Sequence, residues 1–468
     1  MALRFYNTLT RKVEEFAPIE PGHVRLYTCG PTIHDFVHIG NFRTFLFEDL
    51  LRRYLKYKGL EVTQVMNLTD IDDKIIRKSI AEGTPFRDYT ERYRRAFFQD
   101  LDTLGIEHAE HYPAASEHIP EMVELIQGLV REGYAYEVNG DYYFRINTFP
   151  DYGRLANIQI DQLKMGARIA TDEYEKEQAG DFALWKAWDQ EDGDIFWDTP
   201  LGRGRPGWSI ECSAMAMKYL GNHFDIHTGG VDNIFPHHVN EIAQSEGATR
   251  QTFVNVWLHS AHLIVEGQKM AKSLNNFYTL RDLLEKGFAP RAIRYLLLST
   301  HYRQQLNFTF ESLKGAAEAL QRLYDFVDKV STSTLKTGVP NLTIARAVET
   351  VQVQFEEALD DDLNISPALA AVFNFVRDVN REMAGRKLSY EDGRNVLDTM
   401  DRLDLVLGVL TREEVSPDLQ VEALLVERRQ ARDAKNWQRA DEIRDELAAL
   451  GIVLEDGAEG TRWKRKVQ

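Results

Sequence analysis

The sequence predicts an α/β protein, in which a Rossmann-type parallel sheet domain with an insertion is followed by an α-helical bundle and a small C-terminal α+β unit. A β-prone run at 24–28 leads through a Gly-Pro loop into a helical pattern and then a second strand at 61–66, the order of a parallel βαβ unit. Residues 290–410 are strongly helical. With 468 residues the chain is too long for one compact core, so about three units are expected.

The first helix is expected from Asn41, where apolar residues begin to recur at helical spacing, and Gly59 is a suitable stop. A second helix is expected to start at Thr69-Asp70, whose side-chain oxygens can cap it. Further along, changes in composition mark the segment boundaries. An acidic stretch at 172–181 falls in an insertion, and Ser416-Pro417 separates a last unit, predicted as a helical hairpin with a strand-rich tail. The predicted segments are the first half of the sheet domain (1–109), the insertion (110–204), the second half of the sheet domain (205–265), a region with a lysine loop (266–310), the bundle (311–412) and the C-terminal unit (416–468).

Composition excludes some classes of protein. No apolar run approaches the roughly 18 residues that a membrane span needs, and the N-terminus lacks the apolar core of a signal peptide, so we expect a cytoplasmic protein with no membrane partner. The net charge of −17 argues against a general nucleic-acid coat. The last seven residues, 462–468, nevertheless hold four cations and no acid, which leaves room for local binding of RNA.

The only two cysteines, Cys29 and Cys212, are unsuited to a disulfide in a reducing compartment. Pro236 suits the first position of a helix, on which His237 and Glu241 would share one face. Together these side chains would supply two thiolates, an imidazole and a carboxylate, a set that zinc accepts. Two inert buried thiols and a solvated helix face remain the alternative, because the spacing alone is not a zinc-finger pattern.

Two further segments suit a nucleotide. The stretch 29–41 lies where a strand meets a helix N-terminus, which favours phosphate, and His38 and Asn41 can donate hydrogen bonds there. Lys269 and Lys272 lie three apart on a loop that starts with glycine and could reach a triphosphate. A solvated basic loop is the alternative for the lysines when they are considered alone.

Taken together and in this order, the two segments resemble the two ATP signatures of class I aminoacyl-tRNA synthetases. The surrounding sequence is more specifically similar to the cysteinyl-tRNA synthetases, and the resemblance covers essentially the whole chain. The stretches that carry it are 29–32, 67–74, 207–215, 224–232, 235–238 and 456–463.

This resemblance implies a function and a set of site residues. The enzyme would activate L-cysteine with ATP and Mg²⁺ to cysteinyl-adenylate and pyrophosphate, then transfer cysteine to the 3′-terminal adenosine of tRNA(Cys). It would hold one Zn²⁺ per chain, which recognises the substrate thiolate, and we expect a monomer. The implied residues are Cys29, Cys212, His237 and Glu241 as zinc ligands; Thr69, Trp208 and His227 around cysteine; His38, Gly40, Asn41, Asp232, His259, Lys269 and Lys272 around ATP, with Asp232 near the ribose and His259 near the adenine; and His38, Asn41, Lys269 and Lys272 as catalytic groups.

The resemblance also assigns 266–310 to contacts with the tRNA stem and 416–468 to the anticodon. The tRNA contacts would come from Arg428, Arg429, Arg432, Lys435, Trp437, Arg439, Arg462, Trp463, Lys464, Arg465 and Lys466. The alternative is an ordinary amphipathic hairpin with Ala431, Ala440, Ile443 and Leu447 as its buried stripe.

Some positions depart from the commonest family pattern. Asn41 replaces a histidine, Ala271 replaces a serine, Asn275 stands where glycine is usual, and Val239 stands where an acid is frequent. These departures keep open a non-catalytic tRNA-binding paralogue. A second alternative is the related cysteine ligase of mycothiol synthesis, which would use the same adenylate chemistry but join cysteine to an amino-sugar.

Overall fold

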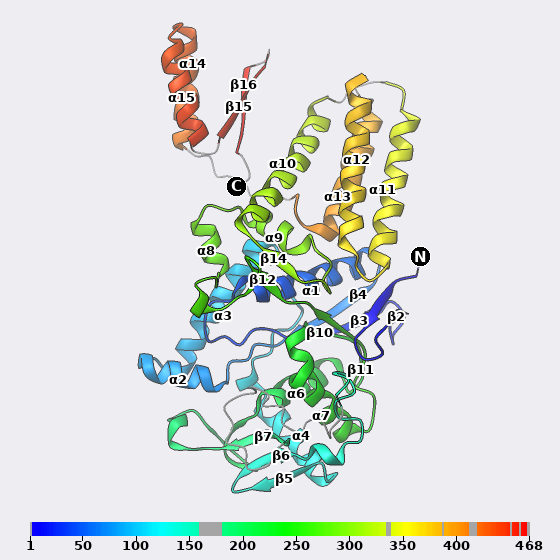
Figure 1. The fold of residues 1–468 in the computed structure, drawn as a ribbon, viewed down its shortest axis with the longest axis vertical. Coiled ribbons are helices and arrows are strands. Elements are labelled where there is room, and N and C mark those ends of the chain that lie inside the picture. The colour runs from blue at the N-terminus through cyan, green and yellow to red at the C-terminus, as the bar shows by residue number, and fades with distance from the viewer. Residues whose placement is uncertain are drawn as a thin grey trace. The chain divides into compact units, whose positions relative to one another are not determined.

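The computed structural model describes residues 2–158, 180–333, 338–385, 388–410, 419–449, 452–457 and 460–465. Figure 1 shows the helices and strands as a ribbon. The chain divides into two compact units. The first unit comprises Met1–Leu280, Leu298–Asn307 and Val353–Ala371, and the second comprises Arg281–Leu297, Phe308–Gln352 and Val372–Gln468. Most of the predicted acidic stretch, the break at 416–417 and Lys466 lie outside the described residues. The six predicted segment boundaries stay predictions.

A four-stranded sheet with strand order β11-β10-β3-β4 forms the centre of the first unit. All three strand pairs are parallel, which confirms the predicted Rossmann-type sheet. The apolar residues that alternate along these strands are buried, including Val24, Leu26 and Ile226. The strands are β3 (His23–Thr28), β4 (Glu61–Met66), β10 (Phe224–Gly230) and β11 (Val254–Ser260).

Helix α1 (Ile39–Tyr57) connects β3 to β4 and starts two residues before the predicted position. Gly59 has a φ of 83°, so it takes the left-handed conformation that ends a helix and that glycine adopts without strain. The predicted cap of the second helix is wrong. Helix α2 (Asp73–Glu82) is capped by Asp72, which accepts from the Lys74 backbone N–H.

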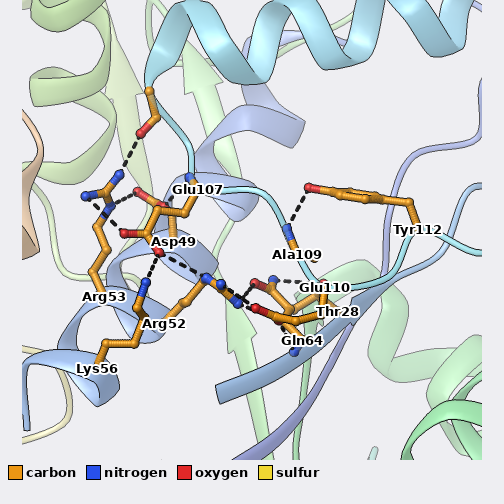
Figure 2. A network of polar contacts seen from close by, with 11 residues as sticks. Thr28, Asp49, Arg52, Arg53, Lys56, Gln64, Glu107, Ala109, Glu110 and Tyr112 are labelled. Carbon is orange, nitrogen blue, oxygen red and sulfur yellow. Dashed lines mark hydrogen bonds and ion pairs between the residues drawn. The ribbon is translucent and has the colours of Figure 1, made fainter. Parts of the chain in front are cut away.

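A polar network fixes α1 against β4 (Figure 2). Arg52 on α1 contacts Glu110 at 2.7 Å and Glu107 at 3.1 Å. Its Nη1 also donates to Gln64 Oε1 at 3.4 Å, and Gln64 Nε2 donates to Thr28 Oγ1 at 3.3 Å. Because Thr28 ends β3, the network connects the C-terminal half of α1 to the residue that precedes Cys29.

The inserted part of the first unit contains a separate sheet with strand order β5-β6-β7-β9-β8, in which every pair is antiparallel. Its strands are β5 (Ala135–Val138), β6 (Asp141–Phe144), β7 (Phe182–Ala187), β8 (Trp197–Thr199) and β9 (Gly202–Pro206). The other elements up to residue 308 are β1 (Arg4–Asn7), β2 (Lys12–Glu15), α3 (Phe86–Leu104), α4 (Ile119–Arg131), α6 (Trp208–Leu220), α7 (Val239–Thr249), β12 (Leu263–Val265), β13 (Gln268–Lys269), α8 (Leu280–Glu285), α9 (Pro290–Leu298) and β14 (Leu306–Phe308).

Long helices follow, as the sequence predicts. They are α10 (Phe310–Ser333), α11 (Leu342–Asp360), α12 (Ile365–Gly385) and α13 (Tyr390–Leu407). The C-terminal residues form the helices α14 (Leu419–Asp433) and α15 (Trp437–Ala449), then an antiparallel pair, β15 (Ile452–Gly457) and β16 (Gly460–Arg465). The predicted stripe of Ala431, Ala440, Ile443 and Leu447 is buried. Among the described residues, no helix is long and apolar enough to cross a membrane.

Candidate metal and nucleotide site

Four predicted metal ligands meet near the carboxyl end of the central strands. Cys29 directly follows β3, Cys212 lies on α6, and Glu241 lies in the first turn of α7. His237 precedes α7 in a helical turn that starts after Phe235, whose backbone is extended (φ −135°, ψ 130°). One ligand atom from each of the four lies within 4.8 Å of the others, and all four residues are buried.

The His237 imidazole is held from two sides. Its Nε2 lies 3.1 Å from Glu241 Oε1, as expected for side chains four residues apart on one helix face. Its Nδ1 lies 3.2 Å from Ser209 Oγ. The Trp208 ring stacks on the imidazole with the centroids 4.0 Å apart. Contacts of this kind orient a metal-binding histidine, and they bring the predicted pocket residue Trp208 to the edge of the cluster.

The electrostatics of the cluster suit a cation. Burial, followed by the neighbouring Cys212 and Glu241, raises the pKa of the Cys29 thiol well above its usual value. Burial also raises the pKa of Glu241 to about 8, although the nearby His237 lowers it in part. Acidic groups crowded in an apolar interior are costly to ionise without a compensating charge. A cation bound among them would supply that charge, and two sulfurs, a nitrogen and an oxygen are donors that zinc accepts.

A second set of possible ligands shares two members with the first. Cys29, His227, His238 and Glu241 also offer ligand atoms within 4.8 Å of one another. His227 Nε2 lies 2.9 Å from Glu241 Oε2, and His238 Nε2 lies 3.3 Å from Cys29 Sγ. His227 was predicted for the cysteine pocket. Sequence reasoning missed His238, although it is the second histidine of the Phe-Pro-His-His motif.

His238 and His259 form a line of imidazoles. His238 Nδ1 lies 2.8 Å from His259 Nε2, and His259 Nδ1 lies 2.8 Å from Thr8 Oγ1. Burial, with neighbouring histidines, lowers the pKa of His259 to about 3 and that of His238 well below its usual value. Both rings are therefore neutral near pH 7, and they can form a continuous chain of hydrogen bonds that ends at Thr8. His259, predicted near the adenine, is buried with both ring nitrogens in contact with other side chains.

Thr69 is linked to the cluster through Glu211, which directly precedes Cys212. Its Oγ1 donates to Glu211 Oε2 at 3.1 Å and accepts from Asn67 Nδ2 at 3.2 Å. The Gly30 N–H donates to Asn67 Oδ1 at 3.0 Å, and a Cβ on Gly30 would lie only 1.8 Å from the Asn67 carbonyl oxygen. Only glycine therefore lets the loop after Cys29 approach so closely. Glu211, which the sequence analysis did not select, is buried, and burial raises its pKa well above the usual value.

The phosphate-binding residues predicted at the start of α1 lie together. His38 is the N-cap, and its Nδ1 accepts from the Asn41 N–H at 3.2 Å. Burial lowers the pKa of His38 to about 4, partly opposed by Asp232, so the ring is neutral near pH 7. A Cβ on Gly40 would lie 3.0 Å from the His38 ring and 3.1 Å from Met270 Cε. The lysine loop thus lies directly against this turn.

Lys272 contacts the predicted nucleotide loop. Its Nζ lies 2.8 Å from Asp35 Oδ2 and 5.0 Å from the centre of the Phe277 ring. Lys269 is exposed at the end of β13, and its carbonyl accepts from Asn276 Nδ2 at 3.1 Å. Asn275 has a φ of 51°, which explains why asparagine can stand where glycine is usual, because both tolerate this conformation. Asp232 is exposed in the turn that follows β10.

The predicted tRNA contacts in the hairpin differ in their surroundings. Trp437 and Lys435 are exposed, whereas Arg428 is buried. Arg439 already contacts three carboxylates of the hairpin, which are Glu427, Glu442 and Glu446. The side chains predicted at 462–466 lie outside the described residues.

Three family models match separate parts of the chain. Residues 15–318 match the model of the class I (C) tRNA synthetase catalytic domain. Residues 354–411 match the DALR domain, and residues 417–463 match the anticodon-binding domain of cysteinyl-tRNA ligase.

Similar curated proteins match over almost the full length. The cysteine–tRNA ligase of Protochlamydia amoebophila (strain UWE25) is 50% identical over 473 residues, which cover 99% of this chain and 98% of that protein. Those of Brachyspira hyodysenteriae and Solibacter usitatus are each 47% identical, and cover at least 99% of this chain and of their own.

Among solved structures, Mycobacterium tuberculosis methionyl-tRNA synthetase in complex with methionyl-adenylate superimposes with a TM-score of 0.60. The sequences are 15% identical, and the match covers 83% of this chain and 90% of that one. This likeness shows a shared fold and nothing finer.

Proposed function

The chain belongs to the cysteine–tRNA ligase family, as its motifs predicted, and from this membership we propose that it attaches L-cysteine to tRNA(Cys) in two steps. In the first step the cysteine carboxylate oxygen forms a bond to the α-phosphorus of ATP, and the bond to the β-phosphate oxygen breaks to release pyrophosphate. In the second step the 2′-hydroxyl of the terminal adenosine forms an ester with the activated carbonyl carbon, and AMP leaves. Neither step needs a side-chain nucleophile, so the protein contributes position and charge.

Cys29, Cys212, His237 and Glu241 are proposed to hold one zinc ion. The support is their burial, the 4.8 Å grouping of their donor atoms and the raised pKa values, which a cation would offset. His227 Nε2 already faces Glu241 Oε2, whereas Oε1 lies on the His237 side. His227 is therefore better suited to orient the Glu241 carboxylate than to bind the metal.

A metal at this position also suits the choice of amino acid. A pocket that recognises shape alone rejects an isostere by only about a hundredfold, and serine differs from cysteine by one atom. When bound, zinc would act as a Lewis acid that lowers the pKa of the substrate thiol. It would therefore bind the sulfur of cysteine more tightly than the hydroxyl of serine. Trp208, Thr69 and His227 would then enclose the amino acid, with Thr69 oriented by Glu211 and Asn67.

The N-terminus of α1 and the lysine loop are proposed to bind ATP with Mg²⁺. Backbone N–H groups at a helix N-terminus attract phosphate, and Gly40 allows close approach. His38 would act as a neutral hydrogen-bond donor, since its pKa is lowered to about 4. Lys269 and Lys272 would stabilise charge on the departing pyrophosphate, with Asn41 as a further donor. Asp232 is proposed near the ribose and His259 on the adenine side.

The single observation that carries the proposal is the buried cluster of two thiols, an imidazole and a carboxyl in a chain of this family. Cysteine-dependent exchange of pyrophosphate into ATP, followed by charging of tRNA(Cys), tests it. We expect exchange with cysteine but not serine, and charging of tRNA. Exchange without charging would indicate the amino-sugar ligase, which the matched anticodon-binding domain disfavours. Absence of exchange would indicate a non-catalytic tRNA-binding paralogue.

A further inference from the structure

Asp35 lies in the loop between Cys29 and α1, and neither the sequence motifs nor the proposed reaction assigns it a role. Its two carboxylate oxygens are used differently. Oδ1 accepts from the Phe36 N–H at 2.9 Å, which fixes the orientation of the side chain. Oδ2 accepts from two ammonium groups, those of Lys272 at 2.8 Å and Lys78 at 3.2 Å.

The loop that carries Asp35 is held firmly from the side of α2 and α3. The carbonyl of His34 accepts from Tyr89 Oη at 2.8 Å and from Lys78 Nζ at 3.2 Å. Asp35 therefore belongs to a fixed surface, whereas Lys272 is 66% exposed on the lysine loop. Of the two partners, the lysine loop is the one that the ion pair restrains.

The ion pair with Asp35 places the Lys272 ammonium close to the predicted phosphate site at the start of α1. The ammonium lies 5.0 Å from the centre of the Phe277 ring, and the same ring meets the His38 ring edge-on at 5.1 Å. The Ile39 N–H, at the start of α1, donates to the carbonyl of Tyr278 at 3.0 Å. The lysine loop is thus docked on the helix N-terminus through backbone, aromatic and ionic contacts.

We propose that Asp35 is a positioning residue for Lys272: its carboxylate holds the lysine loop against the His38 turn, so that the ammonium is in place before the nucleotide arrives. This inference rests on the proposed role of Lys272 at the triphosphate. An ammonium has three N–H donors, so Lys272 can keep one bond to Asp35 and direct another to a phosphate oxygen. Two lysines against one carboxylate leave a net positive charge at this place, which favours rather than repels the nucleotide.

The charge balance at Asp35 supports the same assignment. Burial alone would raise the pKa of Asp35, but the hydrogen bond from Lys272, the Phe36 N–H and the Lys78 charge together lower it to about 2. The carboxylate is therefore ionised throughout the pH range in which such an enzyme works. The contact is solvent-exposed on the lysine side, so its removal should change rates by a modest factor rather than abolish them.

The decisive experiment measures pyrophosphate exchange for Asp35→Asn, Lys272→Ala and the double variant. We expect Asp35→Asn to lower kcat/KM for ATP by about fivefold and to leave KM for cysteine unchanged. Asp35→Glu should recover most of this loss, because it restores the charge. In the Lys272→Ala background the Asp35→Asn change should have almost no further effect, since a residue that acts through Lys272 has nothing left to position. Additive losses would overturn the proposal.

Lys78→Met is the matched control, because Lys78 contacts the same Asp35 oxygen from the other side. It should leave kcat/KM for ATP within about twofold of the wild type, because Tyr89 Oη still donates to the His34 carbonyl and the Phe36 N–H still orients Asp35. If it reproduced the Asp35→Asn defect, Asp35 would be acting as part of the loop scaffold, and the proposal would be wrong.

A second readout does not depend on activity. Trypsin cleaves after lysine, and the ion pair with Asp35 keeps the Lys272 side chain from the protease. In the nucleotide-free protein, cleavage at Lys272 should be about fivefold faster in Asp35→Asn than in the wild type, with sites outside the lysine loop unchanged. Equal cleavage rates would refute the restraint itself. If the wild type catalyses no exchange, the proposed function fails, while the cleavage result still decides whether Asp35 holds the loop.

Discussion

Replacement of Gly30 by alanine adds only a methyl group, but it should lower both the stability of the protein and the rate of cysteine activation. The added Cβ would lie 1.8 Å from the Asn67 carbonyl oxygen, whereas real Cβ atoms essentially never come closer than 3.0 Å to a neighbour. The obstacle is backbone, so the two segments must separate by about 1.2 Å. The movement would weaken the Gly30 N–H bond to Asn67 and shift Cys29, the preceding residue.

Two magnitudes follow. Forcing an extra carbon into a packed interior costs about 1–3 kcal/mol of unfolding free energy. A misplacement of about 1 Å at a reacting centre can cost about a hundredfold in rate, so kcat/KM for cysteine in pyrophosphate exchange should fall by about that factor. Urea denaturation and the exchange assay measure the two effects separately.

Gly128→Ala is the matched control, because the new Cβ would lie 3.7 Å from Arg131 Nη2, an ordinary contact on helix α4. It should be neutral or stabilise the protein by about 0.5–1 kcal/mol, with unchanged exchange. A Gly30→Ala protein with wild-type stability and wild-type kcat/KM for cysteine would show that the close approach to Asn67 is not needed.

Three further predictions concern the metal, the half-buried His38 and the buried Glu48. Elemental analysis should find one zinc per chain, and Cys212→Ser and Glu241→Gln should each lower that content and weaken cysteine activation; full metal content in both would exclude them as ligands. The unfolded state of His38 binds a proton at about pH 6.5 and the folded state only at about pH 4, so stability falls as pH drops through this window. His38→Gln should flatten that acid side of the stability curve, and an equally steep curve would contradict the assignment. Glu48 accepts from Thr228 at 2.8 Å, and burial raises its pKa to about 8, so stability should fall as pH rises from about 4.5 to 8. Glu48→Gln should remove that loss in urea titrations at pH 5 and pH 8, whereas a loss as large as in the wild type would show that another group is responsible.

The sequence predicted the features that depend on local spacing. The strands β3 and β4, the helix between them and the shared face of His237 and Glu241 all follow from periodicity over a few residues. The four proposed ligand positions followed from the family resemblance, and the structure brings their donor atoms within 4.8 Å of one another.

Contacts between distant residues could not be predicted in this way. Asp35 and Lys272 are separated by 237 residues, and no pattern near either one indicates the other. The line from His238 to His259 likewise depends on how the turn that carries His238 packs against Trp257 and His259 of β11. The misplaced cap of α2 has a different cause. Asp70, which looked like a cap, accepts instead from Ser116 Oγ at 2.5 Å and from its backbone N–H, a partner far along the chain.

The network around Arg52 has a consequence for the two proposed substrate sites. Helix α1 begins directly after its N-cap His38, and Arg52 of this helix is connected to Thr28, the neighbour of Cys29, through the Gln64 side chain. The same helix therefore positions both the proposed nucleotide site at its N-terminus and, through Gln64 and Thr28, the proposed zinc ligand Cys29. A substitution that loosens the contacts of Arg52 should therefore weaken the binding of ATP and the binding of cysteine together.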